Sequence, residues 1–63
     1  MNTTVTVNYD SRDAVKNALV DLMGAEIPGE QIFVDKKENQ IKVIIPKSGE
    51  PEVRELLGRH NPV

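Results

Sequence analysis

The stretch from Gln31 to Pro46 limits the possible folds most, because two short runs of alternating apolar and polar residues flank a charged turn at residues 36–39. Alternation with a period of two sends one set of side chains to each face of a sheet. If Asp35 stands opposite Gln40, the aliphatic side chains of both runs share one face, and a slip of one residue would separate them. These side chains are Ile32, Val34, Ile41 and Val43. The pattern therefore predicts a β-hairpin with one apolar face.

The other face of this hairpin carries two apolar side chains, Phe33 and Ile44, next to Lys42. Scattered apolar residues are common on protein surfaces. The same pair would also serve as a contact patch, so both interpretations stay open at this point.

The N-terminal half of the chain reads as a strand followed by a helix. Val5 and Val7 alternate with Thr4 and Thr6 in a strand over residues 3–8, which carries no charge. We expect Asp10 or Ser11 to cap the helix that follows. Its apolar stripe is expected to dock on the sheet, and Gly24 is expected to end it in a left-handed conformation. The stripe consists of Ala14, Val15, Ala18, Leu19, Leu22 and Met23.

A second helix is predicted after the hairpin. Ser48 is the expected cap, and Pro51 suits the first turn because its missing N–H group costs little there. Val53, Leu56 and Leu57 then follow the spacing of one helical face.

The order strand, helix, strand, strand, helix predicts a single α+β domain over residues 1–63 with two layers. A right-handed crossover makes the first two strands parallel, and the third then fits between them. We therefore expect a three-stranded sheet in the order 1-3-2 with both helices on one face. This is a ferredoxin-like plait that lacks its last strand. The first strand is left as an open edge, which invites pairing. The alternative is that residues 60–63 cover this edge.

Composition excludes several classes of function. The chain has 63 residues, no cysteine, one histidine and a net charge of −2. We therefore expect no disulfide, no thiolate or histidine-rich metal site and no cofactor. Nucleic-acid binding is disfavoured because no positive stripe is evident. No run is long and apolar enough for a membrane helix, and we expect no secretion signal, because the first residues lack a basic segment followed by an apolar one. A cytoplasmic protein is the expectation.

Several stretches carry a resemblance to known proteins: a strand running into Tyr9-Asp10-Ser11, the helix at 14–23 with Gly24, Ile27-Pro28 before Ile32-Phe33-Val34, and a helix at 53–57 followed by Arg59-His60. In these stretches the chain resembles the short bacterial heat-induced or general-stress domains with a ferredoxin-like core. The resemblance implies a stress-related role without catalysis and transfers no site residues.

Two classes of function remain in view. One is a small interaction module that pairs with a second copy or another protein through the first strand or the outer sheet face. The candidate contact residues are Thr4, Thr6, Phe33, Lys42 and Ile44. The alternative is a sensing domain that binds a small molecule between two chains, near Tyr9, Asp10 and the 24–30 loop. We expect no enzyme, because Ser11 and Ser48 are explained as caps and His60 as a helix-end residue.

Overall fold

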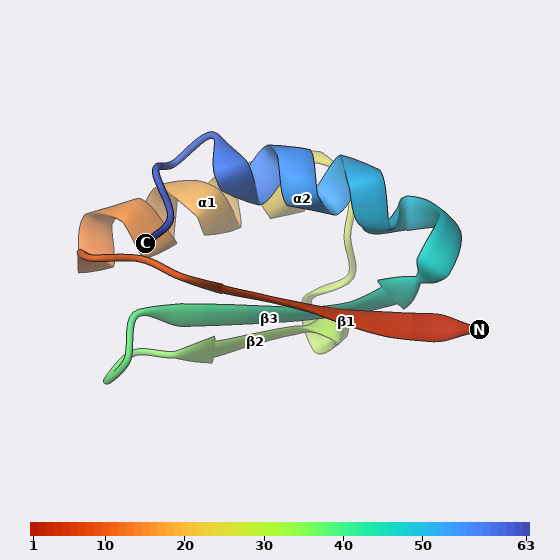
Figure 1. Ribbon diagram of the computed structural model, residues 1–63, viewed down its shortest axis with the longest axis horizontal. Coiled ribbons are helices and arrows are strands. Elements are labelled where there is room, and N and C mark those ends of the chain that lie inside the picture. The colour runs from red at the N-terminus through yellow and green to blue at the C-terminus, as the bar shows by residue number, and fades with distance from the viewer.

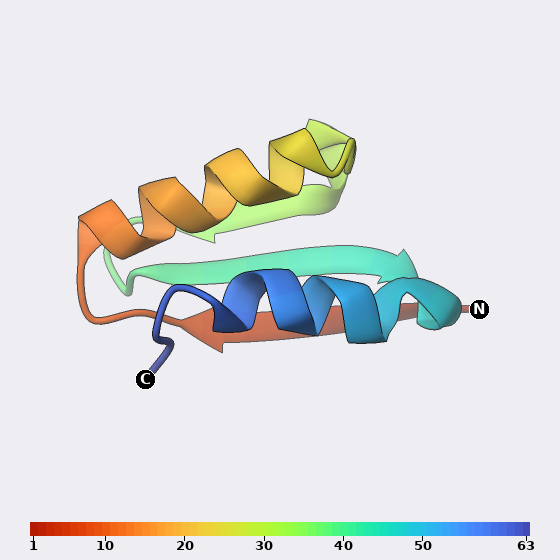
Figure 2. The same ribbon diagram turned by 90° about the horizontal axis from the view of Figure 1, so that it is seen from above.

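The computed structural model describes residues 1–63 and has the predicted α+β fold with a three-stranded sheet. Strands β1 (Asn2–Asn8) and β2 (Ile32–Asp35) both pair antiparallel with β3 (Gln40–Pro46), which gives the order β1-β3-β2. Helices α1 (Arg12–Gly24) and α2 (Glu50–Gly58) cover one face of the sheet (Figure 1). Seen from above, α1 lies over β2 and α2 lies over β1 (Figure 2). The predicted strand order is therefore confirmed. Neither helix is long and apolar enough to cross a membrane.

The hairpin has the register that its alternation predicts. Asp35 stands opposite Gln40, and Val34 stands opposite Ile41. On the other side of β3, Val5 of β1 faces Val43. One set of alternate apolar side chains from each strand thus points to the helix layer, where it packs against the buried faces of both helices. The buried residues are Val5, Tyr9, Val15, Ala18, Leu22, Ile41, Val43, Ile45, Val53 and Leu57.

Helix α1 begins as expected but ends differently. The Ser11 side chain accepts a hydrogen bond from the Ala14 N–H group at 3.1 Å, so Ser11 is the cap. The prediction that Gly24 ends the helix in a left-handed conformation is wrong, because no glycine has a positive φ. Glu26 takes the left-handed conformation instead (φ 64°). The N–H groups of Glu26 and Ile27 return to the carbonyls of Met23 and Leu22. This is the Schellman pattern of bonds at a helix end, displaced toward the C-terminus.

The prediction that Met23 belongs to the buried stripe of α1 is also wrong, because its side chain is 64% exposed. An α-helix has 3.6 residues per turn, so each step of four residues advances by about 40° beyond a full turn. The row that starts at Val15 therefore drifts away from the buried face, and Leu19 is only partly buried.

Two short 3-10 turns lead into the later elements. Residues Gly29–Gln31 (η1) precede β2, and residues Lys47–Gly49 (η2) precede α2. Ser48 lies inside η2, so the expected cap is wrong: Gly49 occupies the cap position and no side chain caps the helix there. Pro51 lies in the first turn of α2, as predicted.

Candidate functional site

The outer edge of β1 exposes unpaired backbone groups at alternate residues. The Tyr9 N–H group donates to the Asn39 carbonyl at 2.8 Å, and the Lys47 N–H group donates to the Met1 carbonyl at 3.0 Å. Bonded and non-bonded pairs alternate along an antiparallel ladder. The odd-numbered residues of β1 therefore bond to β3, whereas the N–H and C=O groups of Asn2, Thr4 and Thr6 point away from the sheet.

The C-terminal residues cover only the last part of this edge. The Val63 N–H group donates to the Asn8 carbonyl at 2.9 Å. In Figure 1 the C-terminus lies next to the end of β1, away from the first half of the strand. The C-terminal residues therefore protect the edge at Asn8, as the alternative predicted. The outward backbone groups of Thr4 and Thr6 remain uncovered.

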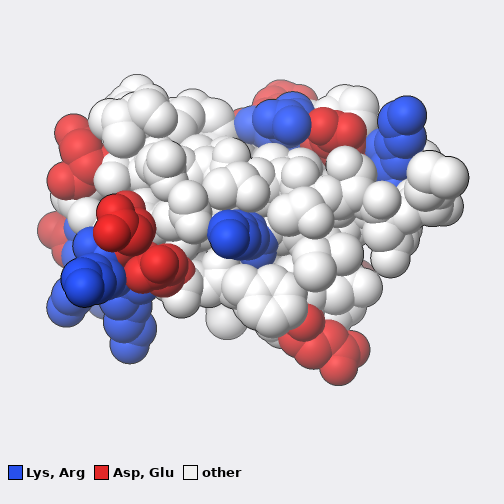
Figure 3. Space-filling model, turned by 60° about the horizontal axis from the view of Figure 1, so that its bottom comes forward, with Lys and Arg blue, Asp and Glu red and all other residues white.

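The open face of the sheet is largely uncharged. It faces away from both helices, and its side chains come from alternate residues of each strand. These are Asn2, Thr4, Thr6, Asn8, Phe33, Asp35, Gln40, Lys42, Ile44 and Pro46. Among them only Asp35 and Lys42 carry charge, and the view of this face in Figure 3 shows a broad uncharged area around one basic group.

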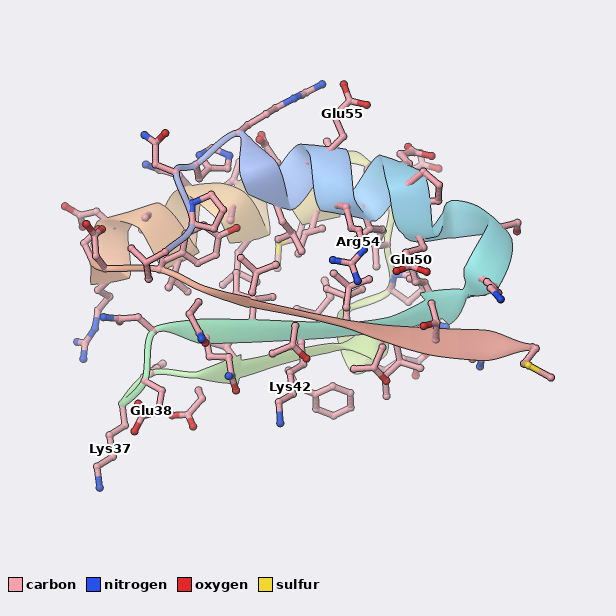
Figure 4. The ribbon with its side chains drawn as sticks, viewed as in Figure 1. Lys37, Glu38, Lys42, Glu50, Arg54 and Glu55 are labelled. Carbon is pink, nitrogen blue, oxygen red and sulfur yellow. The ribbon has the colours of Figure 1, made fainter.

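Two of the predicted contact residues are exposed apolar side chains on this face. Phe33 is 51% exposed and Ile44 is 36% exposed. Phe33 stands opposite Lys42 on the neighbouring strand, and Lys42 extends away from the helices in Figure 4. A shallow cavity of about 140 Å³ lies here, lined by residues that include Phe33, Asp35 and Lys42. The structure therefore brings Thr4, Thr6, Phe33, Lys42 and Ile44 onto one face.

The residues of the alternative ligand site have different surroundings. Tyr9 is 3% exposed, and its hydroxyl group donates a hydrogen bond to the Leu57 carbonyl at 2.6 Å. Burial raises the pKa of Tyr9 to about 12. Asp10 is exposed next to it. Neither of the two cavities contains Tyr9, Asp10 or a residue of the 24–30 loop, so the ligand site stays a prediction without a cavity at this place.

A contact that sequence reasoning missed joins α1 to the segment that follows α2. His60 Nε2 lies 2.6 Å from Asp21 Oδ2, and both side chains are partly buried. The residues are 39 positions apart, so no local spacing could reveal the pair. It fixes the segment after α2 against α1. No group of three or more metal-binding side chains occurs anywhere in the chain.

Comparison with known proteins adds no further assignment: no family model, no curated protein and no solved structure matches this chain. The resemblance to general-stress domains therefore stays a prediction.

Proposed function

We propose that the chain is a small interaction module without catalytic activity, which associates with a second copy of itself through the edge of β1. The observation that carries this proposal is the row of unpaired backbone groups at Asn2, Thr4 and Thr6. An exposed strand edge is a template for another strand. We extend the proposal to the stress-related role that the sequence resemblance implies.

A second copy suits this edge because β1 is neutral. Residues Asn2–Asn8 include no charged side chain, no proline and no interruption of the register with β3. Natural edges are protected by such features. Two identical neutral strands meet without repulsion between like charges. Paired threonines also hydrogen-bond favourably across antiparallel strands.

A two-fold axis makes the pairing antiparallel and self-complementary. Because Asn8 already accepts a bond from Val63, the proposed register is centred on Thr4. Thr4 then faces the partner's Thr4, and Asn2 faces the partner's Thr6. Each of these pairs exchanges two backbone hydrogen bonds. The two sheets join into one continuous sheet, and the open faces of both copies lie on the same side.

Helix α2 contributes charges of both signs beside this edge. Glu50 Oε2 and Arg54 Nε form an ion pair at 2.7 Å, and Figure 4 shows both side chains extending from α2 toward β1. Because opposite charges lie together, the approach of an identical copy does not bring two surfaces of one sign into contact.

Sedimentation velocity over a wide range of protein concentration tests the proposal. Wild-type protein is expected to shift from one chain mass to twice that mass. Thr4→Pro removes one free donor on the edge without removing a bond to β3, and a proline is tolerated at such a position. We expect Thr4→Pro to stay monomeric with its helical circular dichroism retained. Thr4→Val, which keeps the N–H group, should still associate.

Wild-type protein that remains a single chain at millimolar concentration would contradict the proposal. A dimer that persists in Thr4→Pro and is lost in Phe33→Ser would also contradict it, because the open face would then be the contact surface.

A further inference from the structure

A second surface lies at the opposite edge of the sheet, between α1 and β2. An open cavity of about 230 Å³ lies here and is called the groove below. Its lining combines three aliphatic side chains with three cations. The six residues are Val15, Leu19, Val34, Arg12, Lys16 and Lys36. An apolar floor with a basic rim fits a ligand that has an apolar part and a negative charge.

The three cations of this groove have no acidic partner within the chain. The ion pairs of the protein are Arg54 with Glu50 and Arg59 with Glu55, and Asp21 lies against His60. None of them involves Arg12, Lys16 or Lys36. Although the whole chain has a net charge of −2, this groove therefore offers unpaired positive charge.

The backbone of β2 adds hydrogen-bonding groups beside the groove. Because the odd-numbered residues of β3 bond to β1, its even-numbered residues bond to β2, and Phe33 and Asp35 are their partners. The N–H and C=O groups of Val34 consequently point away from the sheet. The neighbouring outward N–H group, that of Ile32, donates to the Gly29 carbonyl in η1. Val34 is thus the position where another strand can bond.

We propose that this groove binds an extended acidic peptide, which adds to the sheet as a strand beside β2. In this mode of recognition, backbone hydrogen bonds hold the peptide and alternate side chains give specificity. A peptide residue opposite Val34 points to the helix side, where Val15 and Leu19 receive an apolar side chain. The peptide residue opposite Lys36 lies on the same side, two positions away, and is acidic.

The backbone groups favour a peptide over a small amphiphile, because a fatty acid would leave the donor and acceptor of Val34 unused. The proposal does not depend on pairing through β1. The two edges lie on opposite sides of β3, so a dimer formed through β1 would keep both of its peptide grooves free.

A titration of ¹⁵N-labelled protein with the capped hexapeptide Thr-Glu-Thr-Val-Thr-Val tests the proposal. In an antiparallel arrangement its glutamate faces Lys36 and its first valine faces Val34. We expect saturable shifts of the amide signals of Val34, Lys36 and Lys16. Exchanging the glutamate for lysine should weaken binding about fivefold or more. Lys36→Glu should have the same effect, whereas Lys42→Glu on the open face is the matched control and should not.

Methylation of the peptide backbone separates strand addition from other modes of binding. A methyl group on the nitrogen of the first valine removes the bond to Val34 and should abolish binding. Methylation of the threonine before it, whose N–H group points away, should not. Equal binding of both methylated peptides would overturn the proposal. Peptide-induced shifts confined to β1 or the open face would also overturn it. So would shifts of Val34, Lys36 and Lys16 that decanoate produces and the peptide does not.

Discussion

The hydroxyl group of Tyr9 connects the end of β1 to α2, and Tyr9→Phe removes it without removing the ring. The hydroxyl donates to the Leu57 carbonyl at 2.6 Å inside the core. A hydrogen bond of this kind contributes about 1 kcal/mol net. The Leu57 carbonyl also accepts from the His60 N–H group at 3.4 Å, so the variant leaves no acceptor without a partner. We expect a loss of about 1 kcal/mol at neutral pH, which lowers the Tm by about 4–8 °C.

The same substitution changes how stability depends on alkaline pH. Burial raises the pKa of Tyr9 from 10.0 to about 12. Below pH 10 the phenol is neutral in both the folded and the unfolded chain. Above it the unfolded chain ionises first, so the folded state loses stability as the pH rises toward 12. Since one pKa unit corresponds to about 1.4 kcal/mol, this loss is roughly 2–3 kcal/mol, and Tyr9→Phe lacks it.

Urea unfolding of both proteins at pH values from 8 to about 12 measures this difference. Lysines titrate in the same range, but they are common to both proteins and cancel in the comparison. Tyr9 is the single tyrosine, so its ultraviolet absorbance reports the ionisation directly. Parallel stability curves for the two proteins, or a phenol that ionises at its ordinary pKa in the folded chain, would contradict the raised pKa of Tyr9.

Two matched pairs of substitutions test the packing and capping of the helices by thermal or urea unfolding. Leu22→Ala removes a fully buried side chain and should cost about 2–5 kcal/mol, whereas the exposed Met23→Ala should change stability by less than about 0.5 kcal/mol; a similar cost for both would place Met23 in the core. Ser11→Ala should cost about 1 kcal/mol because Ser11 caps α1, whereas Ser48→Ala should be close to neutral because Ser48 caps no helix. Equal effects of the two serine variants would contradict the observed caps.

The fold could be predicted because its determinants are local and mutually consistent. Alternation around Asp35 and Gln40 fixed the hairpin register, and the order of the elements with the crossover rule fixed the position of β3. The wrong predictions concern the helix ends at Gly24 and Ser48 and the edge of the apolar stripe of α1 at Met23. A sequence pattern does not show that Glu26 rather than Gly24 adopts the left-handed conformation, because tertiary packing decides how far a helix continues.

The surfaces could be predicted only in part. Period-two alternation was enough to place Phe33 and Ile44 on the open face. It could not reveal the bond between Val63 and Asn8, the pair of His60 with Asp21, or the cations around the groove of α1 and β2. These features join residues that are distant in the chain, and their positions follow from how each helix lies over the sheet.

Amide hydrogen exchange at Thr4 and Thr6, followed as protein concentration rises, tests whether two copies pair through the edge of β1. We expect both amides to exchange fast in dilute solution and to become protected as two copies pair. Val34, whose amide faces the other edge, should exchange at a rate independent of concentration. Amides of Thr4 and Thr6 that exchange equally fast at every concentration would contradict pairing through this edge.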